Sequence, residues 1–188
     1  MKVFVLPLAL CAGLSARAAE TLEIDATHSA VLFSWNHLGL SNPVARLEKI
    51  EGQVSLDRTD PARSSVTVTL PLDGLRTGVE ALDHRLKGEG FLDAARYPAI
   101  TFQSTSVTMT GPKSFKLAGT LSVHGISRPV VLDAKVNAIA RNGFSGALTA
   151  GFDADIVLRR SDFGVARYVP AISDELVVHI TVHAEPPE

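Results

Sequence analysis

Apolar side chains at every second position are the feature that most constrains this chain. Between His28 and Gly39 a strand would place Val31, Phe33, Trp35 and His37 on one face, because successive strand side chains point to opposite sides. The same alternation recurs in five later segments: 49–57, 65–72, 115–123, 144–158 and 176–184. Such segments are typical of half-buried strands with Thr, Ser, Lys and Asp on the outer face.

The number and linkage of these segments predict an all-β fold. About eight strands, mostly joined as hairpins, favour an eight-stranded antiparallel barrel, with a two-sheet sandwich as the structural alternative. Asn142-Gly143 suits a tight type I′ hairpin turn. Four small residues fall in phase with the large apolar ones and could either leave space along the barrel axis or relieve strain at a bend: Gly52, Gly119, Gly146 and Ala150.

One segment breaks the alternation and predicts a short helical insertion near residues 78–96. Val79, Leu82 and Leu86 recur at spacings of three and four, Thr77 can cap the helix, and a glycine at 88 or 90 can end it. In a barrel, we expect this insertion to lie across one end.

The N-terminus has the organisation of a secretory signal peptide over residues 1–18. Lys2 precedes an apolar run from Val3 to Leu14, and Ala16-Arg17-Ala18 fits the small-residue cleavage rule, with cleavage after Ala19 as the alternative. Residues 19–188 are then a single exported domain, which predicts a periplasmic location. Cleavage would also remove Cys11, the single cysteine, so the mature chain would have neither a disulfide nor a thiolate nucleophile.

Composition and motifs exclude several classes of function. The formal net charge of −2 is scattered, without the basic patch of a nucleic-acid-binding protein. The six histidines show no spacing typical of a metal site, and we expect no metal. His179 and His183 are expected to be solvated surface residues. No serine lies in a nucleophile-elbow motif. We expect the carboxylates of Asp153 and Asp155 to lie on the exterior of the barrel.

The stretch Arg159 to Gly164, RRSDFG, allows two interpretations. Arg160 and Asp162 could form a salt bridge at a turn, or Arg160 could face the head group of an anionic ligand at a barrel rim.

Short motifs follow one another along the chain in this order: Asp25-Ala26-Thr27-His28-Ser29, His37-Leu38-Gly39, Asp83-His84-Arg85-Leu86, Phe91-Leu92-Asp93, Tyr97-Pro98-Ala99-Ile100-Thr101-Phe102, Leu121-Ser122-Val123-His124-Gly125, Arg160-Ser161-Asp162-Phe163-Gly164 and Ser173-Asp174-Glu175-Leu176. With these motifs the chain resembles the YceI-like family of bacterial periplasmic proteins, and the resemblance spans about Leu22 to Ala184.

The resemblance implies a lipocalin-like barrel that binds a long polyisoprenoid chain in its lumen. Our first hypothesis is therefore a carrier of an isoprenoid lipid of the quinone or polyprenyl phosphate class. We expect no cofactor, no catalytic residue and no nucleic-acid partner, and we allow for transient membrane contact and a homodimer. On this hypothesis eleven residues contact the ligand, with His37, Arg85 and Arg160 near its head: Val31, Phe33, Trp35, His37, Leu70, Arg85, Phe91, Phe102, Phe152, Arg160 and Phe163. Two alternatives stay open: an enzyme acting on a lipid-like substrate at His28, His37 or His124, and a filled barrel that serves as an interaction module.

Overall fold

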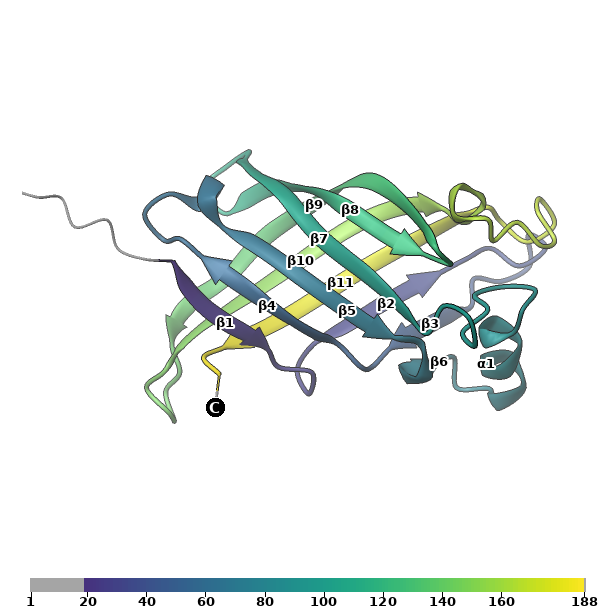
Figure 1. Cartoon of the computed structure of the whole chain (residues 1–188), viewed down its shortest axis with the longest axis horizontal. Coiled ribbons are helices and arrows are strands. Elements are labelled where there is room, and N and C mark those ends of the chain that lie inside the picture. Colours follow the sequence, from purple (N-terminus) through teal and green to yellow (C-terminus); the bar gives the residue numbers. More distant parts are fainter. Residues whose placement is uncertain (1–18, 188) are drawn as a thin grey trace, which may run out of the picture.

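The computed structural model describes residues 19–187, and these form a β-barrel about a long axis (Figure 1). The expected signal peptide, residues 1–18, lies outside the described residues. One short α-helix, α1 (Glu80–Lys87), accompanies eleven strands in the described part of the chain: β1 (Glu20–Ile24), β2 (Ala30–Ser34), β3 (Val44–Leu47), β4 (Glu51–Leu56), β5 (Ser65–Pro71), β6 (Leu75–Arg76), β7 (Ala99–Met109), β8 (Ser114–Val123), β9 (Ile126–Arg141), β10 (Leu148–Arg159) and β11 (Glu175–Glu185).

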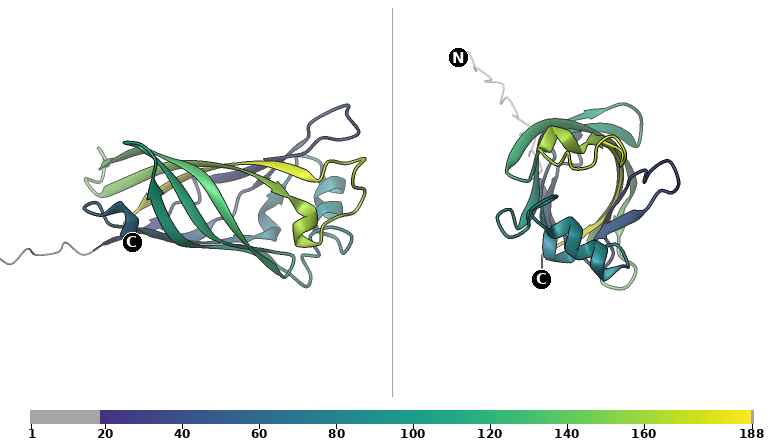
Figure 2. Two further views of the ribbon diagram at one scale, coloured as in Figure 1. Left: turned by 90° about the horizontal axis from the view of Figure 1, so that it is seen from above. Right: turned by 90° about the vertical axis from the view of Figure 1, so that its right-hand side faces the viewer.

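Eight of these strands close into a ring, which is seen end-on in the right-hand view of Figure 2. The order around the ring is β1-β4-β5-β7-β8-β9-β10-β11, and pairing of β11 with β1 completes it. All neighbouring pairs are antiparallel. The predicted eight-stranded antiparallel barrel is therefore confirmed, and the sandwich alternative is wrong.

The barrel closes at a seam where β11 changes partner. Its residues 177–181 pair with β2, whereas Ala184 and Glu185 pair with Ile24 and Glu23 of β1. Residues 25–29 form the turn between β1 and β2. Both of these short strands therefore pair with the same long strand, β11. The strands β3 and β6 continue the sheet beyond β2.

The largest of the fully buried side chains of the core lie on β1, β3 and β6 and in the turn that precedes β6. Leu22, Leu47, Leu72 and Leu75 are almost completely buried there. Along β7 to β11, by contrast, most inward apolar side chains are only partly buried, including Phe102, Leu117 and Ile156. The side chains of β7 to β11 are less buried because they face a cavity inside the barrel.

The predicted helical insertion is present but shorter than the expected span. The helix ends at Lys87, and the chain continues through tight turns to Tyr97. Thr77 does not cap the helix through its first amides; its amide and hydroxyl both donate to the Asp83 carboxylate, at 2.7 and 2.6 Å. α1 flanks one end of the barrel together with the segments 36–42 and 160–172, and we call this the helix end (Figure 2).

Two local predictions are wrong. β10 begins at Leu148, not at Phe144, and Phe144 is fully exposed in the loop 142–147. This loop is longer than a type I′ turn because Asn142 accepts hydrogen bonds from the amides of Phe144 and Ser145 and donates its own amide to Ala147. The residue with positive φ is Gly146, not Gly143.

Two of the small residues in phase with the apolar face, Gly52 and Gly119, allow neighbouring groups to pack closely, and a third, Gly146, lies outside the strands. A Cβ on Gly52 would lie 2.2 Å from the carbonyl oxygen of Thr67, so this glycine permits close approach of two strands. Gly119 is covered by the ring of Phe102, and Gly146 lies in a loop rather than a strand.

Candidate ligand-binding site

A cavity of about 1040 Å³ occupies the interior of the barrel and reaches both of its ends. This volume is at the upper end of the range typical of small-molecule sites, about 300–1,000 Å³. Inward side chains of all eight ring strands except β1 contribute to its lining, and most of them are aliphatic or aromatic. The partly buried residues of β7 to β11 are thus shielded from bulk solvent but face a hollow.

The stretch from His28 to Gly39 places its alternating face on this cavity. Val31, Phe33, Trp35 and His37 all contribute to the lining, and the rings of Phe33 and Trp35 lie 6.0 Å apart. β2 itself ends at Ser34, and His37 is held beyond it by isolated bridges to Ser41 and Ile172. The face therefore continues past the strand to the helix end.

All eleven residues proposed from the sequence to contact a ligand line the cavity. Val31, Leu70, Phe102 and Phe152 belong to its strand walls, whereas Arg85 and Phe91 approach it from α1 and the turn that follows. Whether each of them touches a ligand remains a prediction.

Arg160 has a different role from the one expected of a head-group ligand. Its buried guanidinium donates to four backbone carbonyls of the segment that follows, those of Val165, Arg167, Ile172 and Ser173, at 2.7–3.0 Å. Burial lowers the pKa of Arg160, and the nearby Asp174 carboxylate partly offsets this effect. These four bonds fix the loop 164–173 at the helix end and leave little of the guanidinium for a ligand.

The alternative interpretation of the same stretch, a salt bridge between Arg160 and Asp162, is also not the pairing that forms. The carboxylate that pairs with an arginine of this stretch is Asp174. It forms an ion pair with Arg159 at 3.3 Å and accepts a hydrogen bond from the Ser161 hydroxyl at 2.6 Å. The hydrogen bond from Ser161 lowers the pKa of Asp174, against a smaller opposing effect of burial.

Sequence reasoning missed an aromatic residue at the helix end. Tyr168 lines the cavity, its ring lies 6.2 Å from that of Phe91, and the Arg167 guanidinium lies 4.9 Å from its centre. Tyr168 has a positive φ of 65° in an irregular loop, so no periodic pattern could assign its direction.

The opposite end of the barrel, formed by the loops 57–64 and 110–113, carries polar lining residues that the sequence also did not reveal. They include Asp57, Arg58 and Lys113. The Asp57 carboxylate accepts hydrogen bonds from the Thr59 hydroxyl and amide and the Asp60 amide, and it pairs with Arg63 at 3.1 Å. Chiefly through the Thr59 hydroxyl, these contacts lower the pKa of Asp57 to about 2.

The three histidines considered for an enzyme do not meet at the cavity. His37 lines it, but His28 is exposed in the turn between β1 and β2. His124 packs its ring 4.8 Å from that of Tyr97 and lies 3.3 Å from the Phe163 carbonyl. The described residues therefore do not bring these imidazoles together over a substrate.

The two histidines of β11 also have partners that the sequence did not show. His179 pairs with Asp155 at 2.7 Å on the outer face. His183 is not simply a solvated residue, because its Nδ1 lies 3.3 Å from Asp25 Oδ2, which also contacts His28.

A closed eight-stranded antiparallel barrel with an apolar lumen, flanked at one end by a short helix, defines the class of hollow β-barrels. Residues 22–184 match the YceI-like domain, and the chain belongs to the YceI-like family. Among residues 19–187, no helix combines the length and apolar character that crossing a bilayer requires.

Known relatives extend over nearly the whole chain. A UPF0312 protein of Azotobacter vinelandii is 30% identical over 173 residues, covering 92% of this chain and 90% of that protein. The crystal structure of Campylobacter jejuni YceI is 27% identical, with a TM-score of 0.74 over 81% of this chain and 90% of that one. A polyisoprenoid-binding domain from Saccharophagus degradans shares the fold, with a TM-score of 0.71 at 15% identity, over 91% of this chain and all of that one.

Proposed function

We propose that this protein is a periplasmic carrier that holds an isoprenoid lipid, a quinone or a polyprenyl phosphate, in the lumen of its barrel without covalent chemistry. The observation that carries the proposal is the continuous apolar cavity of about 1040 Å³ along the barrel axis. The fold shared with a polyisoprenoid-binding domain supports it.

A carrier is needed because exposing an apolar prenyl chain to water costs free energy. Each buried CH₂ group contributes about 0.8 kcal/mol of transfer free energy, so a prenyl tail rarely leaves a membrane unaided. A dry lumen lined by residues such as Phe102, Phe152 and Ile156 replaces the membrane interior.

The helix end is the proposed entrance for the lipid. Leu38 and Leu40 lie in the segment 36–42, Val79 precedes α1, and all three are exposed, Leu40 by 83%. Apolar side chains at an entrance would dip into a bilayer surface while the lipid transfers, which supports transient membrane contact. Arg85 on α1 and His37 are placed to meet a polar head.

The first experiment identifies the cargo. Protein purified from its native compartment without detergent is extracted with organic solvent and analysed by mass spectrometry, and the protein is then titrated with a quinone and a polyprenyl phosphate. A prenyl lipid in near-equimolar amount supports the proposal. Absence of a lipid, together with no binding of either added compound, refutes it.

Two neighbouring residues of β10 give a matched pair of variants. Ile156 lines the cavity, whereas Val157 is 58% exposed on the outer wall. Ile156→Asp should abolish lipid binding because a carboxylate in the lumen loses its hydration, and Val157→Asp should bind normally. Should Ile156→Asp fail to fold, Ile156→Thr replaces it with a milder change. Equal binding by the inner and outer variants would refute the lumen as the site.

A further inference from the structure

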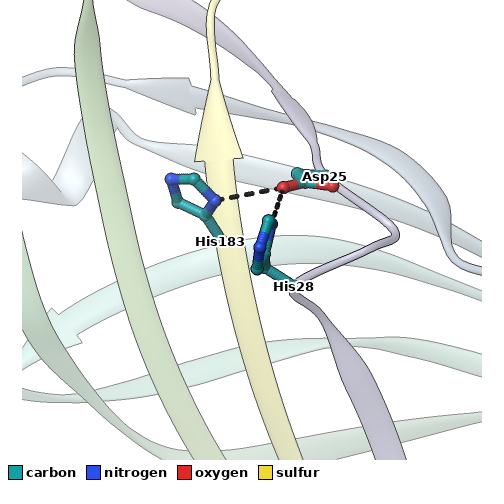
Figure 3. A group of neighbouring side chains, drawn as sticks. All are labelled: Asp25, His28 and His183. Carbon is teal, nitrogen blue, oxygen red and sulfur yellow. Dashed lines mark hydrogen bonds and ion pairs between the residues drawn. The ribbon is translucent and has the colours of Figure 1, made fainter. Parts of the chain in front are cut away.

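A second cluster of chemically active side chains lies outside the lumen, on the seam where the barrel closes. Asp25 at the end of β1, His28 in the following turn and His183 on β11 direct their side chains toward one point (Figure 3). Oδ2 of Asp25 lies 2.5 Å from Nδ1 of His28 and 3.3 Å from Nδ1 of His183. Three potential ligand atoms thus lie within 4.8 Å of one another.

The backbone around this cluster is fixed by hydrogen bonds across the seam. The Asp25 amide donates to the His183 carbonyl at 2.9 Å, and the His183 amide donates to the Ser29 hydroxyl at 3.0 Å. Thr27 donates its amide and hydroxyl to the other oxygen of Asp25, at 2.8 and 2.6 Å, and so orients the carboxylate. Such outer hydrogen bonds are what positions ligands in metal sites.

We propose that Asp25, His28 and His183 bind a divalent transition-metal ion of the Zn²⁺ type on the outer wall of the barrel. Two imidazoles and one carboxylate are a ligand set that Zn²⁺ takes in proteins, with a remaining position for water. Tetrahedral bonds of about 2.0–2.1 Å separate neighbouring ligand atoms by about 3.3 Å, which is the spacing of Asp25 and His183. His28, with 72% of its side chain exposed, has the freedom to swing back by about 0.8 Å to complete the set.

The charges around the cluster favour a cation. Glu23 and Glu185 lie directly opposite each other in the β1–β11 pair, next to Asp25 and His183 along the seam. Like charges at such cross-strand positions repel each other, so a bound cation would stabilise the seam.

Access to the cluster is open on one flank. The residue of β10 opposite His183 is Gly151, which has no side chain to cover the imidazole. An ion bound here would cross-link the turn between β1 and β2 to β11. It would stabilise the closed barrel whether or not a lipid occupies the lumen.

The same strand offers a matched control. His179 also lies on the outer face of β11 and pairs with a carboxylate, that of Asp155 at 2.7 Å, but this pair has two ligand groups and not three. A site made of three converging ligands should be lost on removal of His28 or His183 and should not respond to removal of His179.

The test is a competition titration of Zn²⁺, and in parallel Cu²⁺, between a chromogenic chelator and the protein prepared without an affinity tag. We expect one ion per chain, tighter binding of Cu²⁺ than of Zn²⁺, and a rise in the melting temperature on metal addition. His28→Ala and His183→Ala should each weaken binding at least about tenfold, since even changes to outer groups cost about 10–100-fold. His179→Ala should leave the affinity unchanged.

Two results would overturn the proposal: no stoichiometric binding of either ion, or equal losses in His28→Ala and His179→Ala. If His183→Ala does not fold, as judged by circular dichroism, His28→Ala decides, because His28 is an exposed residue of the turn between β1 and β2 and belongs to neither strand. Lipid binding is not a readout here, so failure of the metal site and failure of the carrier function are distinguishable.

Discussion

Gly119 of β8 lies against the ring of Phe102 of β7, so closely that a Cβ on residue 119 would stand 2.4 Å from Phe102 Cζ. The two residues are diagonal neighbours, since Phe102 pairs with Leu121 and Gly119 with Ser104, beside a bulge in β7. The missing side chain lets the Phe102 ring pack directly against the backbone of residue 119. The glycine thus contributes to the lumen indirectly, by keeping a large aromatic ring out of its centre.

Gly119→Ala should therefore destabilise the protein and narrow its lumen. The new methyl group would also lie 2.6 Å from the Gln103 carbonyl oxygen, so both a ring and a backbone must move. Overpacking of this kind costs typically about 1–3 kcal/mol. Urea denaturation measures the loss, and binding of an added quinone should weaken as Phe102 is pushed inward.

The control for this change is Gly111→Ala in the turn between β7 and β8. Its Cβ would meet nothing closer than Ser114 Cβ at 3.8 Å, an ordinary contact. We expect no change in stability there. A Gly119→Ala protein as stable as Gly111→Ala would contradict the packing derived for Phe102.

Arg160→Lys should destabilise the helix end although it preserves the charge. A lysine cannot reach four carbonyls in the fixed fork of a guanidinium, so several acceptors of the loop 164–173 would lose their donor. Hydrogen bonds to charged groups contribute about 1.5–3 kcal/mol each, and we expect a total loss of at least about 2 kcal/mol. Thermal and urea unfolding without added lipid measure it.

The adjacent residue provides the comparison. Arg159 is an exposed partner of Asp174, and surface pairs contribute at most about 1 kcal/mol, so Arg159→Lys should be nearly silent. If Arg160→Lys were equally silent and lost only lipid affinity, Arg160 would be a head-group ligand and the structural role assigned above would be wrong.

The fold was predictable from sequence because strand periodicity is a local property. On β8 the alternation of Phe115, Leu117, Leu121 and Val123 already fixes which side chains face inward, and every one of them lines the cavity. A pattern of this kind cannot tell a filled barrel from a hollow one, since both need the same apolar face.

The parts that could not be predicted depend on contacts between distant or irregular segments. Asp25 and His183 are 158 residues apart and meet only because β1 pairs with β11 where the barrel closes. The partners of Arg160 are backbone carbonyls, which carry no residue signature. Phe144 appeared in phase with β10, yet Asn142 draws its segment into a loop.

Asp57 should make stability depend on pH in the acid range. Its pKa, held near 2 by the Thr59 hydroxyl and neighbouring amides, is below the ordinary 3.8. The native state therefore binds the proton less readily than the unfolded state, and the resulting stability is complete above about pH 4 and lost as the pH falls towards 2. Urea denaturation at several pH values between 7 and 2 measures this loss.

Asp57→Asn isolates this contribution from that of the other carboxylates. The variant should be less stable than the wild type at pH 7, and the difference should shrink between pH 4 and pH 2 because the wild-type carboxylate is then protonated as well. Asp162→Asn, a change at an exposed position, should follow the wild-type curve. A difference for Asp57→Asn that stays constant over this range would show that the loop 57–64 depends on the shape of Asp57 and not on its charge.

Arg85 distinguishes the two classes of isoprenoid ligand at the helix end. Its side chain is exposed on α1 and borders the cavity, where it would meet a phosphate head but gain little from a neutral quinone ring. Arg85→Ala should weaken binding of a polyprenyl phosphate about tenfold, or about 1.4 kcal/mol, and leave quinone affinity within about twofold.

Lys87→Ala, two residues along α1, removes the same charge from a side chain that does not line the cavity, and should affect neither ligand. Equal losses for both ligands in Arg85→Ala would mean that Arg85 shapes the entrance instead of binding the head. Equal losses in both variants would mean that the general charge of the helix end, and not a particular contact, attracts the phosphate.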